Sequence, residues 1–313
     1  MLSTDTKVLE IYAETNLEAC RKLWEQLIPS EHLTDRWDVR LCFHEHFQRD
    51  LLFVVAREEG RIVGFMPLSF IPENNYYGYF PGEVWKNKTW LEQNHLIAKD
   101  QTVLRAMLDW MQSNKMNCHL RYLHGNPQLP PDLSSEDEIG YLFYPKLLNH
   151  SMENYYSLFS RKSIKSIRKE VDNFYSRNVI IRTDQPEDYD LMVKMNLDRF
   201  GENSYFSDQR FAKSFKALKD LLQQNGWLRM TSVVIDGQTI AVDMGCIYNG
   251  AYIILAGGTD YGFPGVAKVI NLYHMKEACE KNYDEVDFLC GDFSWKKIFH
   301  LSPRPLYHLT KMV

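Results

Sequence analysis

Residues 228–248, LRMTSVVIDGQTIAVDMGCIY, contain two apolar runs separated by Asp236 and Gly237. Asp-Gly between two such runs is one of the stronger local signals for a β-hairpin. Residues 51–71, LLFVVAREEGRIVGFMPLSFI, show the same pattern with a Glu-Glu-Gly turn. Both segments are therefore predicted to be hairpins, and they occupy corresponding places in the two halves of the chain.

The sequence around each hairpin repeats as well. Two stretches with helical periodicity precede each hairpin, and a strand, a helix and a further strand follow it. In the first half these are residues 17–28, 36–47, 76–80, 99–112 and 118–124; in the second half they are 188–200, 209–224, 251–258, 265–281 and 285–290. We predict a duplicated α/β (α+β) unit, with domains at residues 1–150 and 151–313. The loop at 125–140, rich in proline and acidic residues, is predicted to be an exposed excursion.

The composition restricts the class of protein. The 313 residues are 45% apolar and carry a net charge of −5, which argues against a general nucleic-acid binder. The N-terminus lacks the pattern of a secretory signal, and no segment approaches the roughly 20 apolar residues that span a bilayer. The six cysteines are scattered, without CxxC pairs. We expect a cytoplasmic protein with reduced thiols.

The order of elements in each half resembles the GNAT (N-acetyltransferase) fold. In the second half, the segment 260–270, DYGFPGVAKVI, resembles the family's phosphate loop: Gly265 and Ala267 match its last two positions, whereas Gly262 stands where glutamine or arginine is usual. The resemblance implies an acyl-CoA co-substrate, such as acetyl-CoA, bound at this loop by Gly262, Gly265, Val266, Ala267 and Lys268. An ordinary strand-to-helix turn is the alternative. The first half lacks such a loop and is predicted to hold no cofactor.

A basic helix is predicted to open the second half, within residues 154–178. Ile164 and Ile167 begin an apolar face, and Arg161, Lys165 and Arg168 gather on another. This basic face could bind an anionic substrate such as CoA phosphates, a nucleotide-sugar, an anionic glycan or tRNA. A solvated face of an amphipathic helix is the alternative.

Three blocks of the second half together resemble the FemAB-like branch of the GNAT superfamily, most nearly the CelD/BcsL-type acyltransferases found near bacterial exopolysaccharide and cellulose genes. The most specific block is 287–296, DFLCGDFSWK, which matches the family ending Asp-Phe-x-x-Gly-Asp-x-x-Tyr-Lys with Trp295 in place of tyrosine. The resemblance implies two GNAT-like domains and an acyltransferase activity. It also implies that Lys296 binds anionic substrate or stabilises charge on the acyl oxygen, with Trp295 beside it.

Acyl transfer needs a base, donors for the developing oxyanion and accurate positioning. Asp243 interrupts an apolar strand and is a candidate base, as are Asp292 and His274. Tyr252 and Tyr273 are candidate acids for the leaving thiolate. Each of the three candidate bases also has a structural alternative. Asp243 could be a core carboxylate with a partner, Asp292 could cap a turn, and His274 could be a core histidine.

No metal site is predicted from these patterns. His44 and His46 are two residues apart on a predicted helix, so their side chains point away from one another. The aromatic cluster at 74–82, NNYYGYFPG, could line a sugar-binding groove or belong to a strand-and-turn core.

Three functions follow as hypotheses. The first is an acyl-CoA-dependent transferase that acylates an amine or hydroxyl of a small molecule or amino-sugar. The second is an aminoacyl-tRNA-dependent transferase of the Fem kind, which would use the basic helix. The third is a catalytically silent GNAT-like protein in polysaccharide biosynthesis.

Overall fold

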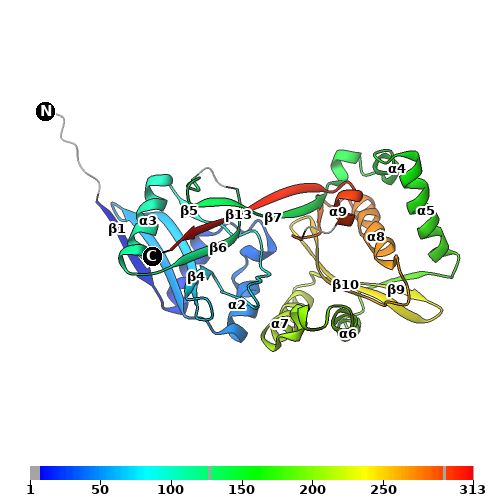
Figure 1. Ribbon diagram of the computed structural model, residues 1–313, viewed down its shortest axis with the longest axis horizontal. Coiled ribbons are helices and arrows are strands. Elements are labelled where there is room, and N and C mark those ends of the chain that lie inside the picture. The colour runs from blue at the N-terminus through cyan, green and yellow to red at the C-terminus, as the bar shows by residue number, and fades with distance from the viewer. Residues whose placement is uncertain (1–7, 126–127, 292–293, 313) are drawn as a thin grey trace. The chain divides into compact units, whose positions relative to one another are not determined.

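The computed structural model describes residues 8–125, 128–291 and 294–312. The chain divides into two compact units, Met1–Glu138 with Pro305–Val313, and Ile139–Arg304. Each unit contains a mixed sheet with helices packed on it (Figure 1). This confirms the predicted α/β class with two tandem domains.

The N-terminal unit follows the predicted order of elements. Its strands are ordered β1-β2-β3-β4-β6-β13, with the short β5 paired to β3. The elements are β1 Leu9–Glu14, α1 Leu17–Leu27, η1 Leu33–Asp35, α2 Trp37–Phe47, β2 Leu51–Glu58, β3 Arg61–Ile71, β4 Tyr76–Tyr79, β5 Ile97–Ala98, α3 Gln101–Ser113, β6 Cys118–Leu123 and the first part of β7 Ser134–Phe143.

The C-terminal unit repeats this plan, with strands ordered β7-β12-β11-β10-β9-β8. Figure 1 shows α6 and α7 below β9 and β10, and α8 above them. The elements are the second part of β7, η2 Pro145–Leu148, α4 Met152–Tyr156, α5 Arg161–Tyr175, β8 Ile180–Thr183, α6 Asp188–Phe200, η3 Gly201–Asn203, η4 Tyr205–Ser207, α7 Gln209–Gln224, β9 Leu228–Ile235, β10 Gln238–Tyr248, β11 Ala251–Thr259, α8 Val266–Lys281, β12 Glu285–Asp287, α9 Ser294–Ile298 and the first part of β13 Ser302–Lys311.

The two predicted hairpins are present as β2–β3 and β9–β10. Both central residues of each turn have positive φ: 49° and 77° at Glu59 and Gly60, and 49° and 79° at Asp236 and Gly237. Two consecutive positive φ angles define the type I′ turn, whose twist matches that of the flanking strands. The residues of the two turns therefore favour the hairpin geometry that the structure shows.

The boundary between the units differs from the predicted break at residue 150. The chain passes from one unit to the other within β7 and returns within β13, whose last part pairs with β6, as at Leu309 and Leu120. The expectation of an exposed loop through 125–140 was wrong from Ser134 onward, because those residues belong to β7. Apolar and polar residues do not alternate regularly in this acidic strand, so its sequence does not predict a strand.

The predicted basic helix consists of two helices. Ser160 accepts from the Ser163 amide as the N-cap of α5, so the helix begins anew after α4. Its apolar face packs as expected, with Ile167 buried. The last predicted strand is also shorter than expected, since β12 ends at Asp287.

Substitution of Gly258 tests how closely α6 packs on β11. A Cβ atom at Gly258 would lie 2.5 Å from the Met192 carbonyl oxygen and 2.8 Å from the Met195 Cβ, both on α6. We expect Gly258→Ala to lower the free energy of unfolding by about 1–3 kcal/mol, because the helix backbone must shift. Urea unfolding followed by circular dichroism measures this effect.

The matched control is Gly262→Ala on an exposed turn, where we expect a change within about 0.5 kcal/mol. Equal stability of the two variants would contradict close packing of α6 at Gly258.

Candidate active site in the C-terminal unit

β11 and β12 pair over only a short distance. Their parallel pairing joins Ala251–Ile253 to Glu285–Asp287. β11 then continues to Thr259 with pairing to β10 on its other side. In the described residues, the second half of β11 thus has an edge that β12 does not cover.

A buried chain of hydrogen bonds crosses the sheet beside this edge. The His274 Nε2 on α8 lies 2.9 Å from Asp243 Oδ2 on β10, and its Nδ1 lies 2.9 Å from the Tyr252 hydroxyl on β11. Thr231 on β9 lies 3.2 Å from the same hydroxyl. His274 and Tyr252 are fully buried, while Asp243 is 8% exposed.

The direction of these bonds follows from the chemistry of the groups. Burial raises the pKa of the Tyr252 hydroxyl well above its usual value, so the hydroxyl keeps its proton. An ionised Asp243 only accepts hydrogen bonds, so His274 Nε2 donates to it. The Nδ1 of a neutral His274 then accepts from Tyr252. This chain holds the imidazole in one tautomer and orients the Asp243 carboxylate.

The lack of a side chain at Gly257 leaves space beside the Asp243 carboxylate. The two residues are cross-strand partners, and a Cβ atom at Gly257 would lie 2.1 Å from Asp243 Oδ1. Only a glycine therefore leaves room for the carboxylate. The Oδ1 atom, which is not the oxygen bound by His274, lies against the part of β11 whose edge is open.

Lys296 lies inside the unit and is 2% exposed. Its Nζ donates to the carbonyl oxygens of Phe288, Leu289 and Cys290 at 2.9, 2.8 and 2.9 Å. The ammonium therefore holds the segment that follows β12, and in this arrangement it binds backbone rather than an external ligand. Trp295 packs edge-on against Phe288 and Phe299 in the same core.

The predicted phosphate loop precedes α8. Gly265 is the N-cap of this helix with φ of 93°, a backbone conformation that favours glycine, and it has no side chain that could cap the helix. Lys268 in the first turn forms an ion pair with Glu170 of α5. The Glu170 carboxylate lies close to the N-cap, 3.6 Å from where a Gly265 Cβ would be.

The remaining predicted residues lie in several places. Arg161, Lys165 and Arg168 are exposed on α5, and Arg168 forms an ion pair of 3.3 Å with Glu153.

Tyr273 is half-buried on α8, and burial raises its pKa. Asp292 lies outside the described residues. The structure thus joins Asp243, His274 and Tyr252 by hydrogen bonds, whereas Lys296 binds the backbone that follows β12.

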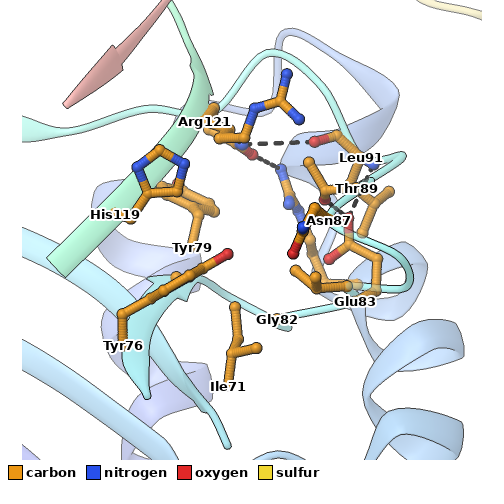
Figure 2. A pocket seen from close by; sticks show the side chains of 14 residues that line it. Ile71, Tyr76, Tyr79, Gly82, Glu83, Asn87, Thr89, Leu91, His119 and Arg121 are labelled. Atoms are coloured by element: carbon orange, nitrogen blue, oxygen red, sulfur yellow. Dashed lines mark hydrogen bonds between the residues drawn. The ribbon is translucent and has the colours of Figure 1, made fainter. Parts of the chain in front are cut away.

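The N-terminal unit has a pocket at the equivalent place, where β4 pairs with β6 only through Tyr77 and Cys118. Figure 2 shows its lining, in which Tyr76 and His119 lie on one side and Glu83 on the other, with Arg121 close to His119 on β6. The Arg121 guanidinium is bound by Asp137 and Glu138, and burial raises the pKa of Glu83 and lowers that of His119.

In the aromatic cluster at 74–82, Tyr76 and Tyr79 both line this pocket, and Tyr79 is also buried in the core. The sequence analysis missed Glu83, which follows β4, and His119 and Arg121, which lie two residues apart on β6. Alternation along a strand places His119 and Arg121 on one face, but no local pattern links them to Glu83.

Comparisons with known proteins identify a domain family within the second half of the chain. Residues 160–297 match the family model described as an acetyltransferase (GNAT) domain. A search of curated proteins finds no match. Among solved structures, FemX is similar with a TM-score of 0.60 and 12% identity, covering 97% of each chain.

Two further structures share the fold. L-PGS from Bacillus licheniformis has a TM-score of 0.58 and 10% identity, covering 96% of this chain and 94% of that one. A tandem GNAT protein from the clavulanic acid biosynthesis pathway has a TM-score of 0.52 and 10% identity, covering 97% and 98%. Residues 160–297 therefore match a GNAT acetyltransferase domain, and the chain as a whole shares its fold with FemX and with a tandem GNAT protein. Within its described residues, no helix is long and apolar enough to cross a membrane.

Lys296→Met tests the structural role of the buried ammonium. The substitution removes the donor of three carbonyl oxygens, and we expect it to lower the free energy of unfolding by about 3 kcal/mol. Chemical denaturation measures the change. Lys297→Met on the exposed side of α9 is the control, with an expected change within about 0.5 kcal/mol. A Lys296→Met protein as stable as the control would show that these bonds contribute little.

Proposed function

We propose that this protein transfers an acyl group from acyl-CoA to an amine or hydroxyl, with the reacting groups at the open edge of β11. The supporting observation is the early end of the β11–β12 pairing, with Asp243 Oδ1 placed against Gly257 at that edge. A carboxylate there can accept the proton of the acceptor while backbone groups of β11 lie beside it.

In the proposed reaction, the acceptor nitrogen or oxygen bonds to the acyl carbon and the thioester C–S bond breaks. Asp243 takes the acceptor's proton, and the CoA thiolate leaves and gains a proton from the Asp243 carboxyl group or from water. His274 is a positioning residue, because it binds the other oxygen of Asp243 and is itself held by Tyr252.

The phosphates of the donor are proposed to bind at the N-terminus of α8. A glycine N-cap lets an anion approach the first-turn amides, and Lys268 adds a positive charge. Glu170 now pairs with Lys268, and the two side chains are 43% and 36% exposed. An exposed ion pair contributes only about 0–1 kcal/mol, so a pyrophosphate can displace Glu170 at little cost.

The acceptor is proposed to be a small molecule or an amino-sugar. The resemblance to CelD/BcsL-type acyltransferases supports this class, including a role in polysaccharide biosynthesis.

A second candidate is an aminoacyl-tRNA donor. It is favoured by the exposed basic face of α5, which carries Arg161, Lys165 and Arg168, and by Glu170 at the α8 N-terminus. This donor would need no pyrophosphate site at the helix.

Acetyl-CoA binding is tested by thermal unfolding. A ligand that binds only the folded protein at one hundred times its Kd adds about 2.7 kcal/mol of stability, so we expect acetyl-CoA and CoA to raise the Tm. Lys268→Ala should reduce this shift, whereas Lys276→Ala, at the exposed far part of α8, should not. Glu170→Gln should increase it, because a competing anion is removed.

An unchanged Tm with every CoA thioester would contradict the acyl-CoA donor. Binding of charged tRNA that weakens when Arg161 and Lys165 are replaced by alanine would then support the second candidate.

The role of Asp243 is tested by turnover. In a screen of amines and amino-sugars with acetyl-CoA, followed by thiol release, we expect Asp243→Asn to lower kcat by about 10²–10⁴-fold. Asparagine can still accept from His274, so the fold should persist. Asp236→Asn in the exposed hairpin turn is the matched control, and wild-type turnover by Asp243→Asn would contradict its role as base.

A further inference from the structure

Three histidines meet in the N-terminal unit, far from each other in sequence. One ring nitrogen from each of His32, His95 and His124 lies within 4.8 Å of the others. The ring centroids are 4.5 Å apart for His95 and His124, 4.9 Å for His32 and His124, and 5.9 Å for His32 and His95. All three side chains are partly exposed, so solvent reaches the cluster.

The backbone holds two of these histidines side by side. Asn94 and Leu123 form a parallel bridge, and the His124 amide donates to the Asn94 carbonyl at 2.9 Å. His95 and His124 each directly follow a member of this bridge. The register of the two segments therefore makes these histidines neighbours.

The third histidine is placed by η1. The amide of His32 donates to Asp35 Oδ2 at 2.8 Å, and the amide of Glu31 donates to the same oxygen at 3.1 Å. The turn before η1 is thus fixed by a buried carboxylate. All three ligand candidates are carried by hydrogen-bonded backbone.

Asp35 provides an independent observation. It is 3% exposed, and its Oδ1 lies 3.2 Å from His95 Nε2. Within the described residues neither of these two buried atoms makes a hydrogen bond of good geometry. A buried carboxylate oxygen directed at the cluster supplies the negative charge that a cation site needs.

Arg40 is a buried cation that interacts electrostatically with Asp35, so its charge opposes a metal ion at this site. Its guanidinium donates to the carbonyl oxygens of Thr34 and Phe80 and to Asn94 Oδ1. These contacts direct the guanidinium at carbonyl groups. They also hold Asn94, which precedes His95.

We propose that His32, His95 and His124 bind one divalent transition-metal ion of the zinc class, with Asp35 positioning His95 or neutralising the ion. Imidazole nitrogens are common zinc ligands, with Zn–N bonds of about 2.0–2.1 Å. Nitrogens bound to one tetrahedral ion at that distance lie about 3.3–3.4 Å apart, so the rings must rotate inward from their present spacing of up to 4.8 Å. Water or an external ligand takes the fourth position.

The ion would join three segments: the turn before η1, the loop before β5 and the end of β6. Asn94 also lines the pocket of this unit. The metal would therefore stabilise the segment that forms one wall of that pocket. This proposal is independent of the acyl donor and of the chemistry at Asp243.

The test uses tag-free full-length protein, treated with EDTA and desalted. Zinc is titrated against a chromophoric chelator, bound metal is counted by mass spectrometry, and Co²⁺ is added as a spectroscopic probe of the ligand geometry. We expect one ion per chain, a Co²⁺ visible spectrum typical of nitrogen and oxygen ligands, and a higher Tm with Zn²⁺.

His95→Ala and His32→Ala should each weaken Zn²⁺ binding by at least about 100-fold, whereas His46→Ala on α2 should change it less than threefold. Asp35→Asn should weaken binding by about 10–100-fold while keeping one ion per chain. Circular dichroism of each apo variant checks its fold.

Absence of stoichiometric metal, or equal affinity in wild-type, His95→Ala and His32→Ala proteins, would overturn the proposal. If His95→Ala fails to fold, His32→Ala decides the outcome alone.

Discussion

The hydrogen bond between His274 on α8 and Asp243 on β10 is the interaction on which the C-terminal unit depends. It is buried, and it is continued by Tyr252 on β11 and Thr231 on β9. A single helix is thereby joined to three strands. Because an unpaired buried polar group costs about 1–3 kcal/mol, the helix cannot slide along the sheet without losing these bonds.

The same constraint positions both parts of the proposed site. α8 carries Gly265 and Lys268 at its N-terminus, and β10 carries Asp243 beside the open edge of β11. Lys296 holds the segment after β12 by its carbonyl groups, so the open edge persists. The lysine expected to meet substrate thus contributes to the shape of the site from inside the unit.

The two units share a fold but differ in chemistry. Where the C-terminal unit has a glycine N-cap and a lysine at its helix, the N-terminal unit has a polar pocket lined by Tyr76, His119 and Arg121. Asp100 caps α3 through the Val103 amide at 3.0 Å, so this helix N-terminus is already occupied by a side chain.

The sequence by itself determined the two hairpins, most of the helices and the duplication, because type I′ turns and helical periodicity are encoded by residues that are near neighbours in the chain. It also pointed to Asp243, since a carboxylate in an apolar strand breaks the local pattern. Only the tertiary structure decided the partners of Asp243 and Lys296, the return of β13 to the first unit, and the meeting of His32, His95 and His124. Asp243 and the three histidines meet partners tens of positions away, while Lys296 meets carbonyl groups six to eight positions away. The geometry of these contacts depends on strand register and helix packing, which no local pattern specifies.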